Sequence, residues 1–100
     1  MLFMIQCFDK ADSLELRKAT RDAHLAYASS AGDRLKFGGP MMADEDNMSP
    51  IGSLILLDAA SETAARLFAE NDPYAKAGLF ETVMIKPLVS VLGQWGAPKE

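Results

Sequence analysis

The sequence predicts an α+β fold, and three observations lead to this prediction. Four short apolar segments have the length of strands, and two amphipathic segments begin with helix-capping residues. These segments follow one another in the order β-α-β-β-α-β. This order is the split βαβ arrangement of a ferredoxin-like fold, with a four-stranded antiparallel sheet and both helices on one face. With 100 residues, 49% of them hydrophobic, we expect one domain over residues 1–100.

The first half of the chain is expected to form a strand and a helix. Leu2 to Phe8 is short, apolar on both alternating faces and followed by charge, which indicates a buried strand rather than a signal peptide. The spacing in Asp12-Ser13-Leu14-Glu15 predicts a capping box at the start of a helix. Gly32 is placed to end this helix. Its expected inward stripe comprises Leu16, Ala19, Ala23, Ala26 or Tyr27, and Ser30.

Two further strands are expected in the middle of the chain. Asp33 to Met42 is the second strand, with Leu35 and Phe37 on one face. Gly38-Gly39-Pro40 is expected to break or bend it. After an acidic, exposed connection, Ile51 to Asp58 is the third strand, and its continuous apolar run implies burial on both faces.

The second half is expected to hold a helix, a link and the last strand. Ser61 caps the helix and Pro73 prevents its continuation. Tyr74 to Gly78 is then a short link, and Leu79 to Pro87 the fourth strand. Leu88 to Trp95 is too apolar to be a free tail. The expected inner side of the helix comprises Ala64, Ala65, Leu67, Phe68 and Asn71.

The strands place apolar side chains on both faces of the predicted sheet. Two helices can cover only one face, and the other would expose an apolar patch at or above the size found on ordinary monomers. We therefore expect a homodimer that forms through the open sheet face, with Leu88–Trp95 helping at the edge. The first strand carries Phe3, Ile5 and Cys7 on one face and Leu2, Met4 and Phe8 on the other, and the third strand carries Leu54 and Leu56 on one face and Ile55 and Leu57 on the other.

Composition excludes several classes of protein. A net charge of −4 argues against nucleic-acid binding, and no apolar run approaches the roughly 20 residues of a membrane span. Cys7 is the only cysteine, so no intramolecular disulfide can form and a cytoplasmic location is expected. A single histidine with scattered acids lacks the spacing of metal ligands. We expect no metal and no cofactor, because no dinucleotide or haem motif is present.

His24 is the first candidate for chemistry. Arg17, Arg21 and His24 are spaced by four and three residues, so they share one side of the predicted helix. They can form the cationic lining of a pocket that holds a carboxylate or a phenolate. Alternatively, the arginines form a solvated basic stripe and the histidine has a structural role.

Asp72 is the expected partner of His24. An Asp before Pro73 can simply end a helix and start a turn. In the predicted topology, however, the two helices pack side by side, so the middle of the first approaches the end of the second. Asp72, rather than Asp22, is then expected to accept a hydrogen bond from one imidazole nitrogen and to leave the other free for acid–base work.

Other candidates have alternative explanations. Gly39 and Pro40 can shape a pocket floor, although a strand bulge also explains them. Ser53 can line a pocket, but no nucleophile motif surrounds it. Tyr74 and Phe80 can stack on an aromatic ligand or belong to the core.

At these residues the chain resembles the YciI-like (YCII-related) family of small bacterial proteins. The resemblance covers the chain to about Pro87 and leaves residues 88–100 as an apolar C-terminal extension. It implies a dimeric α/β barrel and an active site built on a His–Asp pair, which falls on His24 and Asp72. One catalytically defined class of relatives is a dehydrochlorinase acting on a chlorinated, hydroxylated quinol. The matching features are the opening strand, Asp12-Ser13-Leu14 leading into Arg17 through Leu25, Gly38-Gly39-Pro40-Met41, the acidic loop before Gly52-Ser53-Leu54, Asn71-Asp72-Pro73-Tyr74 and Ala77-Gly78-Leu79-Phe80.

Three functions remain open from the sequence. The first is an acid–base enzyme that eliminates or isomerises a small phenolic or enolisable molecule, with His24 shuttling a proton and Asp72 fixing its tautomer. In it Arg17 or Arg21 stabilises negative charge, and Tyr74 or Phe80 walls the pocket. The second is a non-catalytic module that binds a small ligand. The third is a structural dimer without a pocket.

Overall fold

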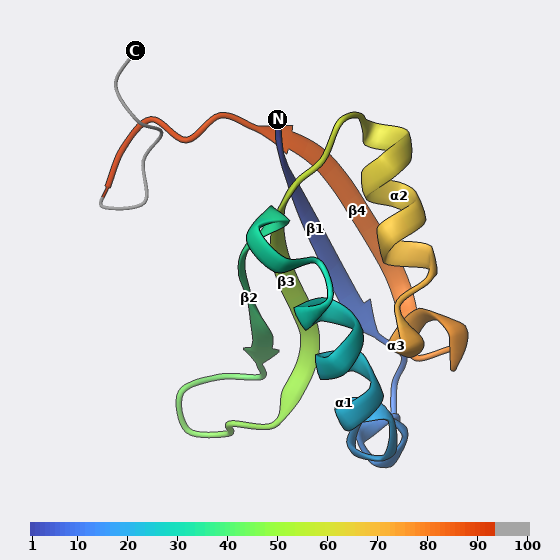
Figure 1. Ribbon diagram of the computed structural model, residues 1–100. Coiled ribbons are helices and arrows are strands. Elements are labelled where there is room, and N and C mark those ends of the chain that lie inside the picture. The colour runs from blue at the N-terminus through green and yellow to red at the C-terminus, as the bar shows by residue number, and fades with distance from the viewer. Residues whose placement is uncertain (94–100) are drawn as a thin grey trace.

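The computed structural model describes residues 1–93 and shows one antiparallel sheet with helices packed on one of its faces (Figure 1). The strands lie in the order β2-β3-β1-β4. The predicted ferredoxin-like α+β fold is therefore confirmed. The elements are β1 (Leu2–Asp9), α1 (Leu14–Ser29), the 3-10 helix η1 (Gly32–Arg34), β2 (Leu35–Met42), β3 (Pro50–Asp58), α2 (Glu62–Glu70), α3 (Pro73–Lys76) and β4 (Phe80–Leu88).

The core lies between the sheet and the helices. Side chains at alternate positions of the central strand β1 point into it: Phe3, Ile5 and Cys7 are almost completely buried. In the register of the sheet, Phe3 lies opposite Leu57 of β3, and Ile5 lies opposite both Ile55 of β3 and Ile85 of β4. The predicted alternation of β1 is confirmed. Helix α2 adds Ala65, Phe68 and Ala69 to this cluster, and the turn between α1 and η1 adds Ala31.

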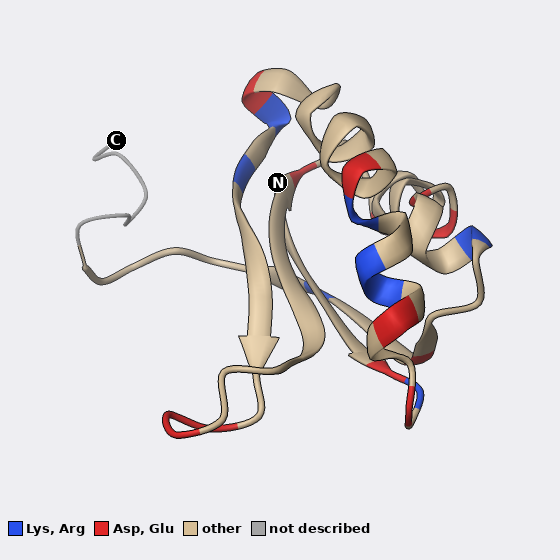
Figure 2. Cartoon of the chain, turned by 90° about the horizontal axis from the view of Figure 1, so that it is seen from below, with Lys and Arg blue, Asp and Glu red and all other residues tan. Residues whose placement is uncertain are grey.

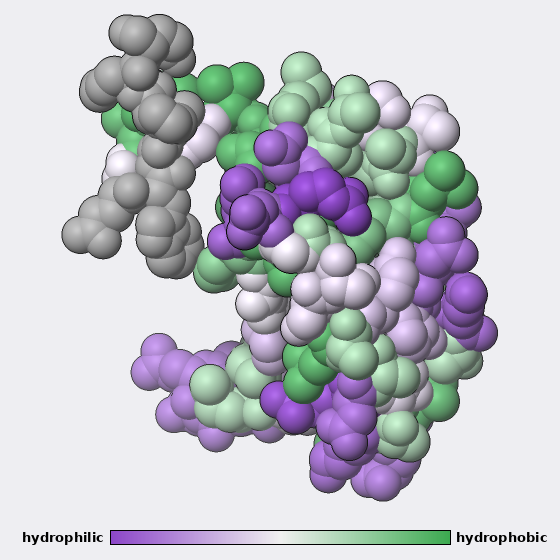
Figure 3. Space-filling model, viewed as in Figure 1, coloured by the Kyte–Doolittle hydropathy of each residue, from purple (hydrophilic) through white to green (hydrophobic). Residues whose placement is uncertain are grey.

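The second sheet face is apolar too, but no helix of the described residues covers it (Figure 1). Met4 lies opposite Leu56 of β3, and Gln6 opposite Leu54 of β3 and Met84 of β4. These side chains are half-buried or exposed. The helix-covered side has a mixed surface instead, with hydrophilic side chains over η1 and the loop between β2 and β3 (Figure 3). The two-faced sheet is therefore present, and the homodimer stays a prediction.

Helix α1 packs with a different side than predicted. Its buried residues are Arg17 and Ala28, and His24 and Tyr27 are half-buried beside them. The expected inward stripe is wrong at Leu16, Ala19, Ala23, Ala26 and Ser30, which are exposed. Burying an alanine side chain contributes little free energy, so the alanines of α1 can remain exposed. The polar side chains on the inward side of α1 all have hydrogen-bond partners. No buried side-chain nitrogen or oxygen of the described residues lacks a hydrogen bond.

The start of α1 also differs from the prediction. Ser13, not Asp12, is the N-cap residue, and it makes no side-chain capping bond. Asp12 has a left-handed backbone with φ of 57°, and the Ser13 hydroxyl donates to the carbonyl of Ala11. The capping box is therefore wrong, because the turn leaving β1 bends the chain back before the helix begins.

Strand β2 begins later than predicted and continues through its glycines. The 3-10 helix η1 takes up Asp33, and the strand is unbroken at Gly38-Gly39-Pro40, contrary to expectation. Pro40 is tolerated because β2 is an edge strand. The pairing with β3 is irregular at two places instead, between Met41 and Met42 and between Leu35, opposite Leu57, and Phe37, opposite Leu56. Leu35 and Phe37 are the two residues that were expected on one face. The two side chains therefore point to opposite faces, and the prediction that they share one is wrong.

The segment around α2 matches the prediction in part. The Ser61 hydroxyl caps α2 by accepting from the backbone N–H of Ala64. Ala65 and Phe68 are buried as expected, but Leu67 and Asn71 are exposed. The predicted link Tyr74–Gly78 is wrong in its first part, because α3 forms a short helix there. This helix starts with Pro73, whose fixed φ suits a first helical position.

The chain leaves the body of the molecule after β4 (Figure 1). Val89, Val91 and Leu92 are exposed. The sequence predicts that the segment Leu88–Trp95 is covered. The end of this segment, including Trp95, lies outside the described residues. Among the described residues, no helix has the length and apolar character needed to span a membrane.

Candidate functional site

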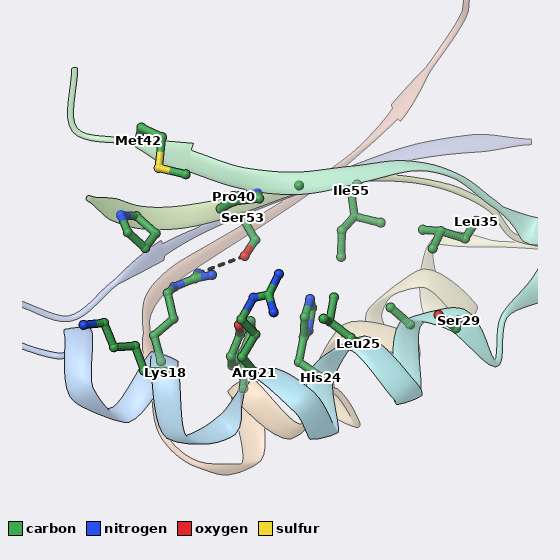
Figure 4. Close-up of a pocket in the computed structure, with 16 residues that line it drawn as sticks. Lys18, Arg21, His24, Leu25, Ser29, Leu35, Pro40, Met42, Ser53 and Ile55 are labelled. Atoms are coloured by element: carbon green, nitrogen blue, oxygen red, sulfur yellow. Dashed lines mark hydrogen bonds between the residues drawn. The ribbon is translucent and has the colours of Figure 1, made fainter. Parts of the chain in front are cut away.

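A cavity of about 490 Å³ opens between α1 and the strands β2 and β3 (Figure 4). Helix α1 forms one wall with a row of side chains that runs from Lys18 through Arg21 and His24 to Leu25. The sheet forms the other wall. Of the residues selected from the sequence, the cavity brings together Arg17, Arg21, His24, Gly39, Pro40, Ser53 and Tyr74.

His24, which lines this cavity, is in direct contact with Asp72. The Nδ1 atom of His24 lies 2.9 and 3.0 Å from the two carboxylate oxygens of Asp72. The carboxylate also accepts a hydrogen bond of 2.9 Å from the backbone N–H of Tyr74, as the N-cap of α3. Asp72 therefore starts α3 and also contacts the histidine, whereas Asn71 is the residue that caps the end of α2; the role of Asp72 in chemistry stays a prediction.

The contact determines which imidazole nitrogen is available. A carboxylate can only accept, so Nδ1 carries the hydrogen and Nε2 has a free lone pair. Within residues 1–93, Nε2 has no hydrogen-bond partner. The His24 side chain is only 13% exposed, yet its ring lines the cavity (Figure 4). Nε2 is thus the atom that can exchange a proton with a ligand.

Tyr74 fixes the plane of the imidazole. Its ring is stacked on that of His24 with centroids 4.0 Å apart and an angle of 16° between the planes. Phe80 lies edge-on behind Tyr74, with centroids 6.0 Å apart. Phe80 packs against the core and does not line the cavity. It can therefore affect a ligand only through Tyr74, and not by the direct contact that the sequence predicts.

Arg17 is buried and held by hydrogen bonds to Asp9 and Ser53. Its Nε and one terminal nitrogen donate to the two carboxylate oxygens of Asp9 at 2.7 and 3.0 Å, and that terminal nitrogen also donates to the Ser53 hydroxyl at 2.9 Å. The guanidinium lies 4.6 Å from the centre of the Tyr74 ring. Burial lowers the pKa of Arg17, but the hydrogen bond and charge of Asp9 outweigh it and raise the pKa overall. The solvated basic stripe is therefore wrong for Arg17.

Asp9 was missed in the sequence, although a signal for it exists. It follows Phe3, Ile5 and Cys7 in steps of two, so strand alternation places it on the helix-covered face. A carboxylate on that face needs a buried partner. On the first helix the candidates for that partner are the basic residues Arg17, Lys18 and Arg21, all of which precede His24.

Arg21 differs from Arg17. It is exposed, lines the cavity and makes no hydrogen bond or ion pair within the described residues. Figure 4 shows its side chain projecting from α1 toward the space in front of Ser53. Burial raises the pKa of the Tyr74 phenol, and the positive charges of Arg17 and Arg21 act against this rise.

Cys7 is not a nucleophile at neutral pH. Burial, with smaller contributions from the charges of Asp72 and Asp9, raises the pKa of its thiol to about 12. Because the thiolate is the reactive form of a cysteine, this rise in pKa disfavours attack by Cys7 at neutral pH. In residues 1–93, no three His, Cys, Asp or Glu side chains are arranged to hold a metal ion.

Comparisons with known proteins identify relatives of this chain. The model of the YCII-related domain matches residues 1–89. The Escherichia coli protein YciI is 41% identical over 97 residues, which cover 91% of this chain and 99% of that protein. A protein of Emericella nidulans, named derivative of benzaldehyde biosynthesis cluster protein C, is 34% identical over 76% of this chain and 85% of its own length.

A solved structure is similar over almost the whole chain. It is the 5-chloro-2-hydroxyhydroquinone dehydrochlorinase of Burkholderia phenoliruptrix, in complex with 2,5-dihydroxybenzoquinone. Its TM-score is 0.81 with 32% sequence identity, and the match covers 97% of this chain and 100% of that one. The match of the family model over most of the chain and the identity to YciI are sufficient for assignment: this chain belongs to the YCII-related family.

Proposed function

We propose that this protein is an acid–base enzyme that acts on a small phenolic or enolisable molecule without a cofactor. The observation that carries the proposal is the His24–Asp72 contact, which leaves Nε2 facing a cavity of about 490 Å³. This volume lies in the range of pockets for small molecules. Positioned proton transfer of this kind typically contributes on the order of 10² to 10⁴ in rate.

In the proposed reaction, Nε2 of His24 removes a proton from the substrate. In an elimination, the electron pair of the broken bond forms a double bond and a leaving group such as chloride departs with its electrons. In an isomerisation, the imidazolium returns the proton to another atom. Asp72 keeps Nδ1 protonated throughout and stabilises the imidazolium that forms. The contact of Asp72 with the Tyr74 N–H supports this fixed role.

The remaining residues have supporting roles in the proposal. Arg21 and, from behind the Tyr74 ring, Arg17 stabilise negative charge that develops on a phenolate or enolate. Tyr74 holds the imidazole plane, and Phe80 supports Tyr74 from its edge. Ser53, Gly39 and Pro40 form the sheet side of the cavity.

Two relatives support the type of substrate. The similar solved structure is that of a dehydrochlorinase for a hydroxylated hydroquinone, and the Emericella relative is named for a benzaldehyde derivative. Small oxygenated aromatic rings are therefore the first compounds to test. A reducing compartment such as the cytoplasm suits the single buried thiol.

We propose further that two copies associate through the open sheet face. The apolar residues of that face support this, because exposed apolar patches of such extent are typical of interaction surfaces. Analytical ultracentrifugation checks the assembly, and a strict monomer at micromolar concentration contradicts it.

The catalytic proposal is tested by measuring chloride release from 5-chloro-2-hydroxyhydroquinone with the His24→Asn variant. We expect a loss of turnover on the order of 10² to 10⁴ with the fold retained in circular dichroism. Asp72→Asn is expected to lose activity as well, because an amide can donate to Nδ1 and favour the wrong tautomer. Unchanged turnover in a folded His24→Asn variant overturns the proposed role. Tight binding of a ligand that is recovered unchanged favours the non-catalytic module instead.

A further inference from the structure

The cavity has an uneven distribution of charge along its length. At one end it is lined by Lys18, Arg21 and the Arg17–Ser53 pair, and at the other by Leu25, Ile55 and Leu35 (Figure 4). His24 lies between the two ends. No Asp or Glu of the described residues lines the cavity, although the whole chain has a net charge of −4. The positive end therefore runs against the overall charge of the protein.

Two of the three cations at that end are not neutralised by a short ion pair. Arg17 is compensated by the two short hydrogen bonds to Asp9. Lys18 reaches only the exposed Glu15, at 3.9 Å, and Arg21 has no partner in the described part of the chain. These residues lie in the first half of α1, where Figure 2 shows basic and acidic segments next to one another, while the loop between β2 and β3 is acidic.

We propose that the substrate carries a carboxylate, which binds between Arg21 and Lys18 while its ring or chain packs on the apolar end. An Arg guanidinium offers two parallel donors that match the two oxygens of a carboxylate. With the carboxylate held there, the carbon skeleton extends past Nε2 of His24 toward Ile55. The inference rests on the proposed function for the position of the reacting atoms. In it Arg21 binds the carboxylate of the substrate, the developing charge is left to Arg17, and small aromatic or enolisable acids are preferred to neutral rings such as 5-chloro-2-hydroxyhydroquinone.

The test compares two probes that differ in one charge: 2,5-dihydroxybenzoate and its neutral amide, 2,5-dihydroxybenzamide. Calorimetry with the wild-type protein is expected to give tighter binding of the carboxylate, with an advantage that weakens as salt is added. In Arg21→Gln the carboxylate is expected to lose roughly tenfold in affinity, the lower end for a hydrogen bond to a charged group because Arg21 is exposed. Lys18→Gln loses less, and amide binding changes in neither variant.

The controls separate this inference from the proposed function. Arg66→Gln removes an exposed arginine of α2 that lies outside the cavity, and it is expected to leave both affinities unchanged. His24→Asn is expected to keep the preference for the carboxylate. If it keeps its turnover while the preference holds, the catalytic proposal fails and the carboxylate site stands.

The carboxylate site is overturned by equal affinity for the two probes. It is also overturned by an Arg21→Gln variant that keeps the preference, and by the absence of binding of either probe at millimolar concentration.

Discussion

The two faces of the sheet carry similar apolar side chains but have different environments. On one face, Phe3, Ile5 and Leu57 are closed in by helices. On the other, Met4, Leu54 and Leu56 remain half-buried. The closed face also contains every buried polar group of the proposed site, from Asp9 and Arg17 to Asp72. The comparison shows that a small chain can use one sheet face to build a polar site within its core while the other face has no covering helix in the described residues.

The largest expected effect comes from breaking the buried ion pair on the closed face. In Asp9→Ala the guanidinium of Arg17 loses its carboxylate while it stays buried, so we expect a loss of about 3–5 kcal/mol in the free energy of unfolding. Urea denaturation measures it. Glu62→Ala, which breaks the exposed pair with Arg66, is the matched control and is expected to cost at most about 1 kcal/mol. Equal effects of the two variants contradict the comparison.

Neighbouring leucines of β3 provide the next test, because they point to opposite faces. Leu57 is completely buried, so Leu57→Ala is expected to cost about 2–5 kcal/mol. Leu56→Ala is expected to cost less in a monomer, since that side chain is only half-buried. Denaturation at low protein concentration compares them. If the two costs are equal, the open face is packed as tightly as the core.

The pH dependence of the free energy of unfolding tests whether the Cys7 thiol is buried on the closed face. The pKa of its thiol is raised from 9.0 to about 12, so the folded state keeps the proton that the unfolded state releases above pH 9. The contribution of the raised thiol pKa to the free energy of unfolding is therefore present below pH 9 and lost as the pH rises toward 12. From pH 8 to pH 10, we expect the wild type to lose about 1 kcal/mol more than Cys7→Ala. Parallel pH profiles of the two proteins rule out this burial of the thiol.

The smallest effect on folding is expected for Met84→Lys on the open face, because this side chain is 44% exposed. The free energy of unfolding of the monomer is expected to change by at most about 0.5 kcal/mol. The proposed dimer, in contrast, is expected to dissociate, since a charge would be placed in its apolar interface. Sedimentation velocity distinguishes the two outcomes. If the variant stays dimeric, the interface between the two copies lies on another surface of the protein.

Strand patterns predicted most of the fold because their signals are local. The alternation in β1 follows from the period of two, and Ser61 caps α2 as its position implies. Helix α1 was oriented wrongly, because its alanines resemble a core stripe and nothing local shows that Arg17 finds a partner in β1. The irregularity between Leu35 and Phe37 was missed for a similar reason: it depends on how β2 pairs with β3.

The candidate site divides in the same way. Spacing alone groups Arg17, Arg21 and His24 on one side of a helix. The spacing predicts the same environment for both arginines. In the structure, Arg17 is bound by Asp9, whereas Arg21 lines the cavity and is available to a ligand. Asp9 itself was overlooked, since a charged residue after an apolar strand is usually taken as the end of that strand.

The sequence by itself determined the order of the elements and the two apolar faces, because these follow from periodicity, capping and residue type. It also led to the choice of His24 and Asp72 for experiment, through the predicted packing of the two helices and the resemblance to the YciI-like family. Only the tertiary structure decided which side of α1 faces inward, which arginine is neutralised and where the cavity opens. Those outcomes depend on contacts between residues far apart in the chain, such as the 48 positions between His24 and Asp72. Burial can satisfy polar groups only when such distant partners meet.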